Sequence, residues 1–225
     1  YRHLKRFLKL YGVTKVQGIL ADFGISSHQI DEPSRGFATR FDAPLDMRMN
    51  IKEGLSAKDI VNNYSAEQLQ NILGFYGEVI NAKTLANKIV ELRDKKPIET
   101  TKDLVEVCKT VSKGIEVKYL SQVFQAIRIE VNDELNAIKD FLQQSEEVLD
   151  TDGRLVIMSY HSLEDRLTKN FMKNGVFEGE PQKDIFGKFE HHLKVITKKP
   201  IEASTAELKI NSRARSAKLR IAQKN

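Results

Sequence analysis

The sequence has little cysteine, proline and glycine, and no tryptophan. Its 225 residues include 1 Cys, 5 Pro and 12 Gly, with 40% hydrophobic and 30% charged residues. That balance excludes collagen-like and disordered classes. A single cysteine, Cys108, excludes an internal disulfide and is typical of a reducing compartment, so we expect it to pack as a small hydrophobe. Without a Cys/His cluster, we expect no metal site.

Long apolar runs are also missing. No stretch of about 18 uncharged apolar residues is present to span a membrane. Tyr1 to Lys9 are basic and amphipathic, without the apolar core of a signal peptide. We expect a globular cytoplasmic protein with no membrane partner.

Acidic residues are absent from both ends of the chain. Residues 1–15 carry five Lys or Arg and residues 209–225 carry six. Removing these cations from the net charge of +5 leaves −6 for residues 16–208. Basic ends of this kind suit a polyanion such as nucleic acid, because neutralising phosphates releases counterions. The alternative is that they only keep the protein soluble.

Two apolar segments predict buried strands of the parallel type, and each is followed directly by a polar residue. Val16–Ala21 leads into Asp22, and Arg154–Tyr160 leads into His161. In open α/β sheets, ligands bind at the carboxyl ends of the strands. Asp22 and His161 are therefore candidate catalytic residues. The alternatives are that Asp22 caps a turn and that His161 only shapes the site.

A Ser-His-Asp hydrolase is rejected for this segment. Ser162 precedes Asp165 by three residues, which is the spacing of a helix N-cap, and apolar residues at helical spacing follow. Further along, Leu193–Ile196 and Ala217–Ala222 predict two more strands. In the last one, Ala217, Leu219 and Ile221 should face inward, and Lys218 and Arg220 outward. We expect Arg213, Arg215 and Lys218, which lie in or just before this strand, to be away from the Asp22 strand end.

The middle of the chain changes character. Residues 29–50 form a long apolar-rich segment that we interpret as an ordered functional loop. Ser56 with Asp59, and Ser65 with Gln68, then predict capped helices without strands between them. We expect an α/β core from residues 1–49 and 119–225, with a helical insertion at residues 50–118 that serves substrate recognition.

Five ordered blocks of the chain are distinctive: Ile19–Asp31 (ILADFGISSHQID), Arg35–Met49 (RGFATRFDAPLDMRM), Phe124–Leu135 (FQAIRIEVNDEL), Gly153–Arg166 (GRLVIMSYHSLEDR) and Asn211–Arg220 (NSRARSAKLR). In these blocks the sequence resembles a known family, the bacterial 16S rRNA cytosine N4-methyltransferases (RsmH, also called MraW). The resemblance implies a Rossmann-like core, S-adenosylmethionine as methyl donor, and a cytidine of the ribosomal decoding centre as target. It also implies that Asp22 and Gln29, and an aromatic residue matched by Tyr1, contact the cofactor.

The family's glycine-rich loop and ribose-binding acid do not occur in this sequence. We therefore expect roughly 80 upstream family residues, within the span of one domain, to be absent from it, and the central strand with them. For the RNA, we expect contacts from six basic side chains, which are Arg35, Arg40, Arg213, Arg215, Lys218 and Arg220.

Methyl transfer to an exocyclic amine requires alignment of donor and acceptor, and a route for the released proton. Asp22 could hold cofactor or amine, and Ser26, Ser27 and His161 could position the base. Phe37 and Phe41 could stack on a cytidine or form loop core. A non-enzymatic RNA-binding protein would explain the basic ends alone, and a helical interaction module only the insertion. The sequence leaves open the oligomeric state, and whether the substrate is naked 16S rRNA or a small subunit.

Overall fold

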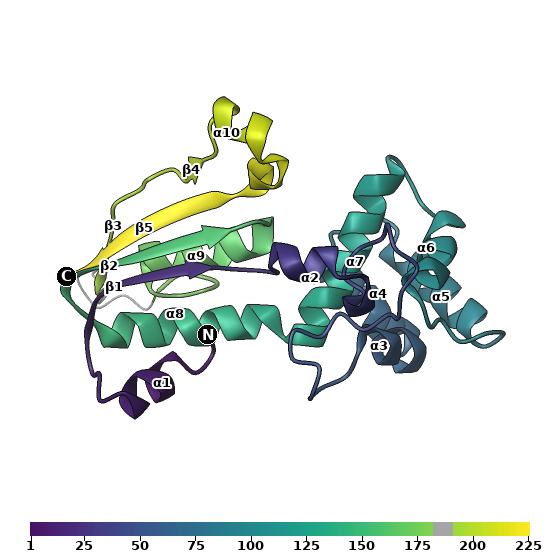
Figure 1. Ribbon diagram of the computed structural model, residues 1–225, viewed down its shortest axis with the longest axis horizontal. Helices are drawn as coiled ribbons and strands as arrows, with labels where there is room; N and C mark the ends of the chain where they lie inside the picture. The colour runs from purple at the N-terminus through teal and green to yellow at the C-terminus, as the bar shows by residue number, and fades with distance from the viewer. Residues whose placement is uncertain (182–190) are drawn as a thin grey trace. The chain divides into compact units, whose positions relative to one another are not determined.

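The computed structural model describes residues 1–181 and 191–225 (Figure 1). Its contacts divide the chain into two units. The first contains Tyr1–Gly24 and Leu135–Asn225, and the second contains Ile25–Glu134. In the described part of the chain, no helix has the length and apolar character needed to cross a membrane.

The unit boundaries differ from those expected at residues 49/50 and 118/119. The loop before residue 50 buries Leu45 and Met47, and the helix after residue 118 buries Val123 and Ile127, all in one apolar cluster. Both segments therefore belong to the helical unit. Sequence reasoning placed them in the α/β core because neither contains a distinctive helix start or stop.

The first unit is a mixed α/β layer structure, and this confirms the expected class. The strands are β1 (Val16–Asp22), β2 (Leu149–Ser159), β5 (Lys218–Lys224) and β3 (Leu193–Val195) in spatial order, with β4 (Ile201–Glu202) also pairing with β5. β1 runs parallel to β2, whereas β5 is antiparallel to β2, β3 and β4. The helices are α1 (Leu4–Leu10), α8 (Glu134–Val148), α9 (Ser162–Asn174), α10 (Thr205–Ile210) and the 3-10 turn η2 (Ser212–Ser216).

The two faces of this sheet are covered unequally. Leu155 and Ile157 of β2 are fully buried in a cluster with Leu142 of α8 and Phe171 of α9. On the opposite face, the side chain of Leu20 on β1 is 72% exposed. The expectation that β1 is a buried strand is therefore wrong in this structure. β1 lies at one end of the strand order, so only part of its surface is covered.

The predicted alternation of β5 is also wrong. Arg220 and Ala222 are buried, whereas Leu219 and Ile221 are only half-buried. Arg220 pairs in register with Ile157 on β2, so its side chain lies on the face that α9 covers. Leu219 and Ile221 instead lie on the less covered face.

The second unit is helical. Its elements are α2 (Ser27–Asp31), η1 (Pro33–Arg35), α3 (Ala57–Asn63), α4 (Ala66–Phe75), α5 (Ala82–Arg93), α6 (Thr101–Lys109) and α7 (Glu116–Asn132). Ser56 and Ser65 cap α3 and α4 in capping boxes with Asp59 and Gln68, as the sequence predicted. These boxes satisfy backbone donors that would otherwise lack a partner at each helix start.

The loop before α3 is held rigidly, which confirms the expected order. The Asn132 side chain accepts a hydrogen bond from the Met49 backbone at 2.6 Å and donates one to the Met47 carbonyl at 2.8 Å. Arg35 donates to the carbonyl of Met49 at 3.2 Å. Gly36 has a φ of +69°, and a Cβ there would meet the Pro44 carbonyl. Side chains from both flanks of the loop therefore fix its path.

Candidate functional site

The carboxyl ends of β1 and β2 meet at one edge of the sheet, which we call the carboxyl edge. Asp22 pairs in register with Met158, and the Phe23 N–H donates to the Met158 carbonyl at 3.0 Å. Because β5 is antiparallel, its first residue, Lys218, lies opposite Ser159 at the same edge. Asp22, the residues that follow β2, and the start of β5 therefore all lie at this edge.

Asp22 is exposed and lies near a neighbouring phenol. The Tyr160 hydroxyl donates to the Met158 sulfur at 3.2 Å. Burial, together with the nearby Asp22 and Glu164 carboxylates, raises the pKa of Tyr160 to about 12. Tyr160 is therefore a neutral donor at physiological pH. The sequence analysis did not include Tyr160 among the candidate site residues. Its position at the end of a predicted strand could have identified it.

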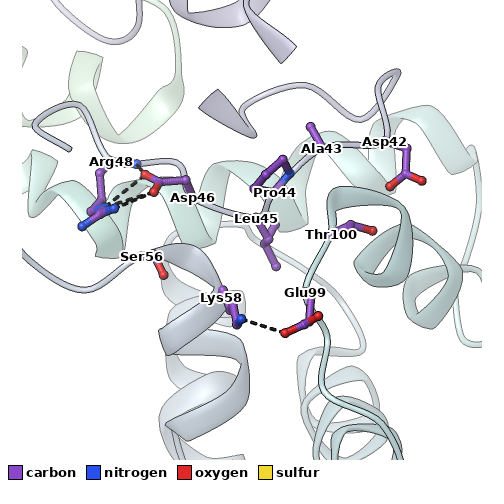
Figure 2. Close-up of a pocket in the computed structure, with 10 residues that line it drawn as sticks. All are labelled: Asp42, Ala43, Pro44, Leu45, Asp46, Arg48, Ser56, Lys58, Glu99 and Thr100. Carbon is purple, nitrogen blue, oxygen red and sulfur yellow. Dashed lines mark hydrogen bonds and ion pairs between the residues drawn. The ribbon is translucent and has the colours of Figure 1, made fainter. Parts of the chain in front are cut away.

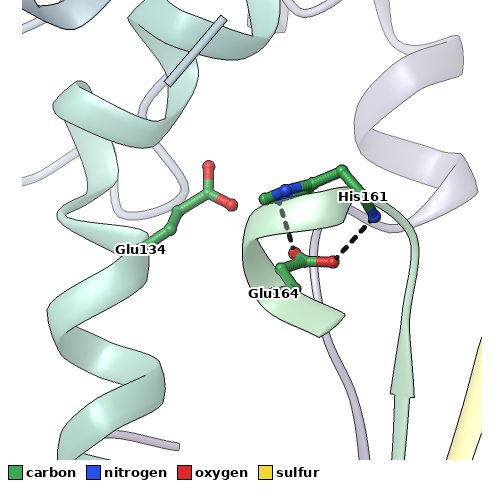
Figure 3. Close-up of side chains that lie close together, drawn as sticks. All are labelled: Glu134, His161 and Glu164. Atoms are coloured by element: carbon green, nitrogen blue, oxygen red, sulfur yellow. Dashed lines mark hydrogen bonds and ion pairs between the residues drawn. The ribbon is translucent and has the colours of Figure 1, made fainter. Parts of the chain in front are cut away.

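His161 begins α9, and Figure 3 shows its ring beside Glu164. Its Nε2 lies 3.1 Å from Glu164 Oε1, and its side chain is 10% exposed. Glu164 Oε2 accepts the N–H of His161 at 3.4 Å and that of Tyr160 at 2.8 Å. The predicted N-cap pair of Ser162 with Asp165 is wrong, because the helix starts one residue earlier with His161 as N-cap and Glu164 as its partner.

Asp165 contributes instead to a buried ion pair between α9 and β5. Its carboxylate accepts from Arg220 Nε at 2.6 Å and from Arg220 Nη2 at 3.0 Å, and Lys218 Nζ lies 3.8 Å away. The expectation that Arg220 contacts RNA is therefore wrong, since a side chain in a buried bidentate pair does not face solvent.

The other C-terminal cations lie closer to the site than expected. Lys218 is half-buried at the carboxyl edge, and Arg213 and Arg215 are exposed on η2, which leads directly into β5. The expectation that this segment lies away from the Asp22 strand end is wrong, because antiparallel pairing returns the start of β5 to the end of β2. Lys218 thus lies at the same edge of the sheet as Asp22.

An aromatic cluster lies beside the end of β1. The rings of Tyr1, Phe23 and Phe141 stand 5.6 to 5.8 Å apart, centroid to centroid, and Phe23 and Phe141 are buried. Tyr1 is 51% exposed, so it offers one flat apolar surface to solvent on a buried aromatic base. A surface of this kind suits a planar ring such as adenine.

The remaining predicted site residues belong to the helical unit. Gln29 closes a capping box, in which its Oε1 accepts the Ser26 N–H at 2.9 Å. Arg40 forms an exposed ion pair with Asp31 at 2.6 Å and stacks on Phe41, with the guanidinium carbon 4.6 Å from the ring centroid. Arg35 is half-buried and holds the loop. Of these, Arg40 and Phe41 present a cation and an aromatic ring together.

Phe37 does not form part of an aromatic wall. Its side chain is 8% exposed and packs in the core of the helical unit. The alternative that Phe37 is loop core is therefore the one the structure supports, whereas Phe41 is half-buried and partly accessible.

A hollow of about 500 Å³ lies beside the loop before α3 in the helical unit (Figure 2). Arg48 pairs with Asp46 at 2.7 Å across its wall, and Lys58 pairs with Glu99 at 2.8 Å. With Asp42, the lining carboxylates outnumber the cations, so the hollow does not favour a phosphate group.

Comparison with known proteins agrees with the geometry. A profile of the MraW methylase family matches residues 1–225. The chain is 56% identical over 225 residues to the ribosomal RNA small subunit methyltransferase H of Flavobacterium psychrophilum, covering 100% of this chain and 77% of that protein. The same enzyme of Cytophaga hutchinsonii is 54% identical over 225 residues, with 100% of this chain and 75% of that protein covered. The chain belongs to the MraW methylase family, with an α/β core of the Rossmann-like methyltransferase class.

Proposed function

We propose that this protein transfers a methyl group from S-adenosylmethionine to the N4 amine of a cytidine in the decoding centre of 16S rRNA. The observation that carries the proposal is the exposed Asp22 carboxylate at the carboxyl edge, beside the neutral Tyr160 hydroxyl. Family membership supports methylation of small-subunit rRNA. The methyl donor and the N4 target are our finer assignment.

The first unit contains side chains that fit the cofactor. The exposed ring of Tyr1 rests on Phe23 and Phe141 and would take the adenine, and Asp22 would accept hydrogen bonds from the polar groups of the cofactor. Gln29 is the third proposed contact, and its amide oxygen also serves the cap of α2. When bound, S-adenosylmethionine supplies an electrophilic methyl group on a sulfonium.

The chemistry required of the protein itself is limited to orientation and proton handling. A carboxylate that accepts an N–H of the cytosine amine fixes its direction and favours its lone pair for attack. The neighbouring Tyr160 hydroxyl would support this by turning to donate to Asp22, which would fix the plane of the carboxylate. The extra proton on the methylated amine would leave through Asp22 to water. His161, at the neighbouring strand end, would position the base.

RNA binding is assigned to exposed cations on both units. Arg213, Arg215 and Lys218 lie at or just before the start of β5, and Arg40 with Phe41 offers a cation and a stacking ring on the helical unit. We propose that the helical unit recognises the substrate, either 16S rRNA or the small subunit. A ribosomal RNA substrate supports the cytoplasm as the proposed location of the protein.

Turnover by Asp22 variants tests the site. Asp22→Asn keeps the shape and one acceptor oxygen but loses the charge, so methyl transfer to small-subunit RNA should fall by roughly 10²- to 10⁴-fold, the range of a lost general base. Tyr160→Phe should lose less, because only the orientation of Asp22 changes. RNA that binds normally to the unsubstituted protein without any methyl transfer would favour the non-enzymatic alternative.

The proposed RNA contacts are tested by the salt dependence of binding. The double variant Arg213→Ala, Arg215→Ala should bind all RNA sequences more weakly and reduce the slope of log K against log salt by about 0.7 for each lost contact. Lys173→Ala, an exposed cation in the last turn of α9, is the matched control and should leave the slope unchanged. Equal slopes for the double variant and the control would refute the contacts.

A further inference from the structure

Glu164 is a carboxylate with no solvent exposure, located directly behind the carboxyl edge. One oxygen, Oε2, accepts the backbone N–H groups of Tyr160 at 2.8 Å and His161 at 3.4 Å. The other oxygen, Oε1, lies 3.1 Å from the His161 ring, as Figure 3 shows. One buried side chain therefore contacts both residues that follow β2.

Burying a carboxylate reduces the stability of the fold. A buried carboxylate loses its hydration, and even a well-made buried ion pair is often matched or exceeded in stability by apolar residues of similar volume. The start of a helix favours a negative charge, which repays only part of that cost. A glutamate here is thus a poor choice for stability alone, but a good one for fixing the direction of the groups that it binds.

The groups that Glu164 fixes lie at the same edge of the sheet as Asp22. The backbone at Tyr160 determines where its phenol points, and the phenol donates at 3.2 Å to the sulfur of Met158, the residue that pairs in register with Asp22. The same carboxylate orients the His161 ring. Gly24, just after β1, also approaches this group, and a Cβ there would stand 3.6 Å from Glu164 Oε1.

We propose that Glu164 is a positioning residue of the methyl-transfer site. It acts through Tyr160 and His161, and contacts neither cofactor nor RNA. Its carboxylate holds the turn after β2 so that the Tyr160 hydroxyl meets Asp22 and the His161 ring keeps one orientation. This inference rests on the proposed function for its effect on turnover, whereas its effect on the turn is independent of that function.

The neighbouring residue Asp165 provides a matched control. It lies on the same turn of α9 and is also an ion-paired, largely buried carboxylate, but it bonds to Arg220 on β5 rather than to the turn after β2. Asp165→Asn should therefore reduce stability without reorienting Tyr160 or His161. A comparison of the two positions separates positioning from anchoring of the helix.

The test uses Glu164→Gln, Glu164→Ala and Asp165→Asn. Glu164→Gln keeps an oxygen for the Tyr160 N–H, so it should fold and lose roughly 10-fold in kcat, while Glu164→Ala should lose roughly 100-fold, the scale of a small misplacement at a reacting centre. The Kd for S-adenosylmethionine should change less than threefold in both. Amide hydrogen exchange at Tyr160 should accelerate in Glu164→Ala, remain near normal in Glu164→Gln, and be unchanged in Asp165→Asn.

The outcomes separate this inference from the proposed function. If the unsubstituted protein transfers no methyl group to cytidine N4, the proposed function fails, and the amide exchange still tests the turn. If Glu164→Gln has normal kcat, or if Tyr160 exchange responds equally to Glu164→Ala and Asp165→Asn, Glu164 only anchors α9 and the inference is overturned. Should Glu164→Ala not fold, the Gln variant alone decides the result.

Discussion

Replacing Arg220 by alanine tests the most direct disagreement between sequence and structure. The alternation of β5 predicted an exposed RNA contact, whereas the structure buries Arg220 against Asp165 with hydrogen bonds of 2.6 and 3.0 Å. Removing one partner of a buried pair leaves the other charge uncompensated, at a cost of about 3 to 5 kcal/mol. Lys218 Nζ, 3.8 Å from the same carboxylate, partly compensates. We therefore expect about 3 kcal/mol.

Thermal and urea unfolding measure this cost. For a protein of this size, about 3 kcal/mol corresponds to a fall in Tm of roughly 6 to 12 °C. Arg215→Ala, which removes an exposed cation, should stay within about 0.5 kcal/mol. The double variant Arg220→Met, Asp165→Leu should recover most of the loss, because no buried charge is left alone. An Arg220→Ala protein with unchanged unfolding and weakened RNA binding would refute the buried pair.

Three further predictions concern the backbone at Gly36 and the pKa values of Asp59 and Tyr160. Gly36→Ala should destabilise the helical unit by about 2 to 4 kcal/mol in urea unfolding, because alanine is strained at φ +69° and its Cβ meets the Pro44 carbonyl. An unchanged unfolding midpoint would contradict the described path of the loop before α3. Hydrogen bonds from Ser56 lower the pKa of Asp59 from 3.8, so the stabilisation that they give is present above that pH and lost as the pH falls through the lowered value; Asp59→Asn should flatten the acid side of a Tm-against-pH curve. For Tyr160, whose pKa is raised from 10.0 to about 12, stabilisation is present below pH 10 and lost between pH 10 and 12. The pKa values of Tyr64 and Tyr119 are also raised to about 12, so Tyr160→Phe should reduce, and not abolish, the late-titrating part of the tyrosinate absorbance.

Local patterns with one physical meaning were predictable from the sequence. A serine followed three residues later by an acid or amide identified the starts of α3 and α4, because such pairs satisfy helix-start donors. The place of Asp22 at the carboxyl edge was predictable, because it follows an apolar strand that pairs in parallel with β2.

Features that depend on tertiary partners were not predictable. Both His161 with Glu164 and Ser162 with Asp165 have the spacing of a helix cap, and serine is the better capping residue. The structure selects the first pair because Asp165 is bound to Arg220. In the same way, the sequence predicts Arg220 at the surface, because the pattern does not show that Asp165 neutralises its charge.

The central claim is tested most directly by identifying the methylated nucleoside. The protein would be incubated with labelled S-adenosylmethionine and small-subunit RNA, the RNA digested to nucleosides, and the labelled product identified by mass spectrometry. We predict N4-methylcytidine from a single decoding-centre position, with the label reduced at least 100-fold for Asp22→Asn. A labelled product other than N4-methylcytidine, or undiminished labelling by Asp22→Asn, would contradict the proposed reaction at the carboxyl edge.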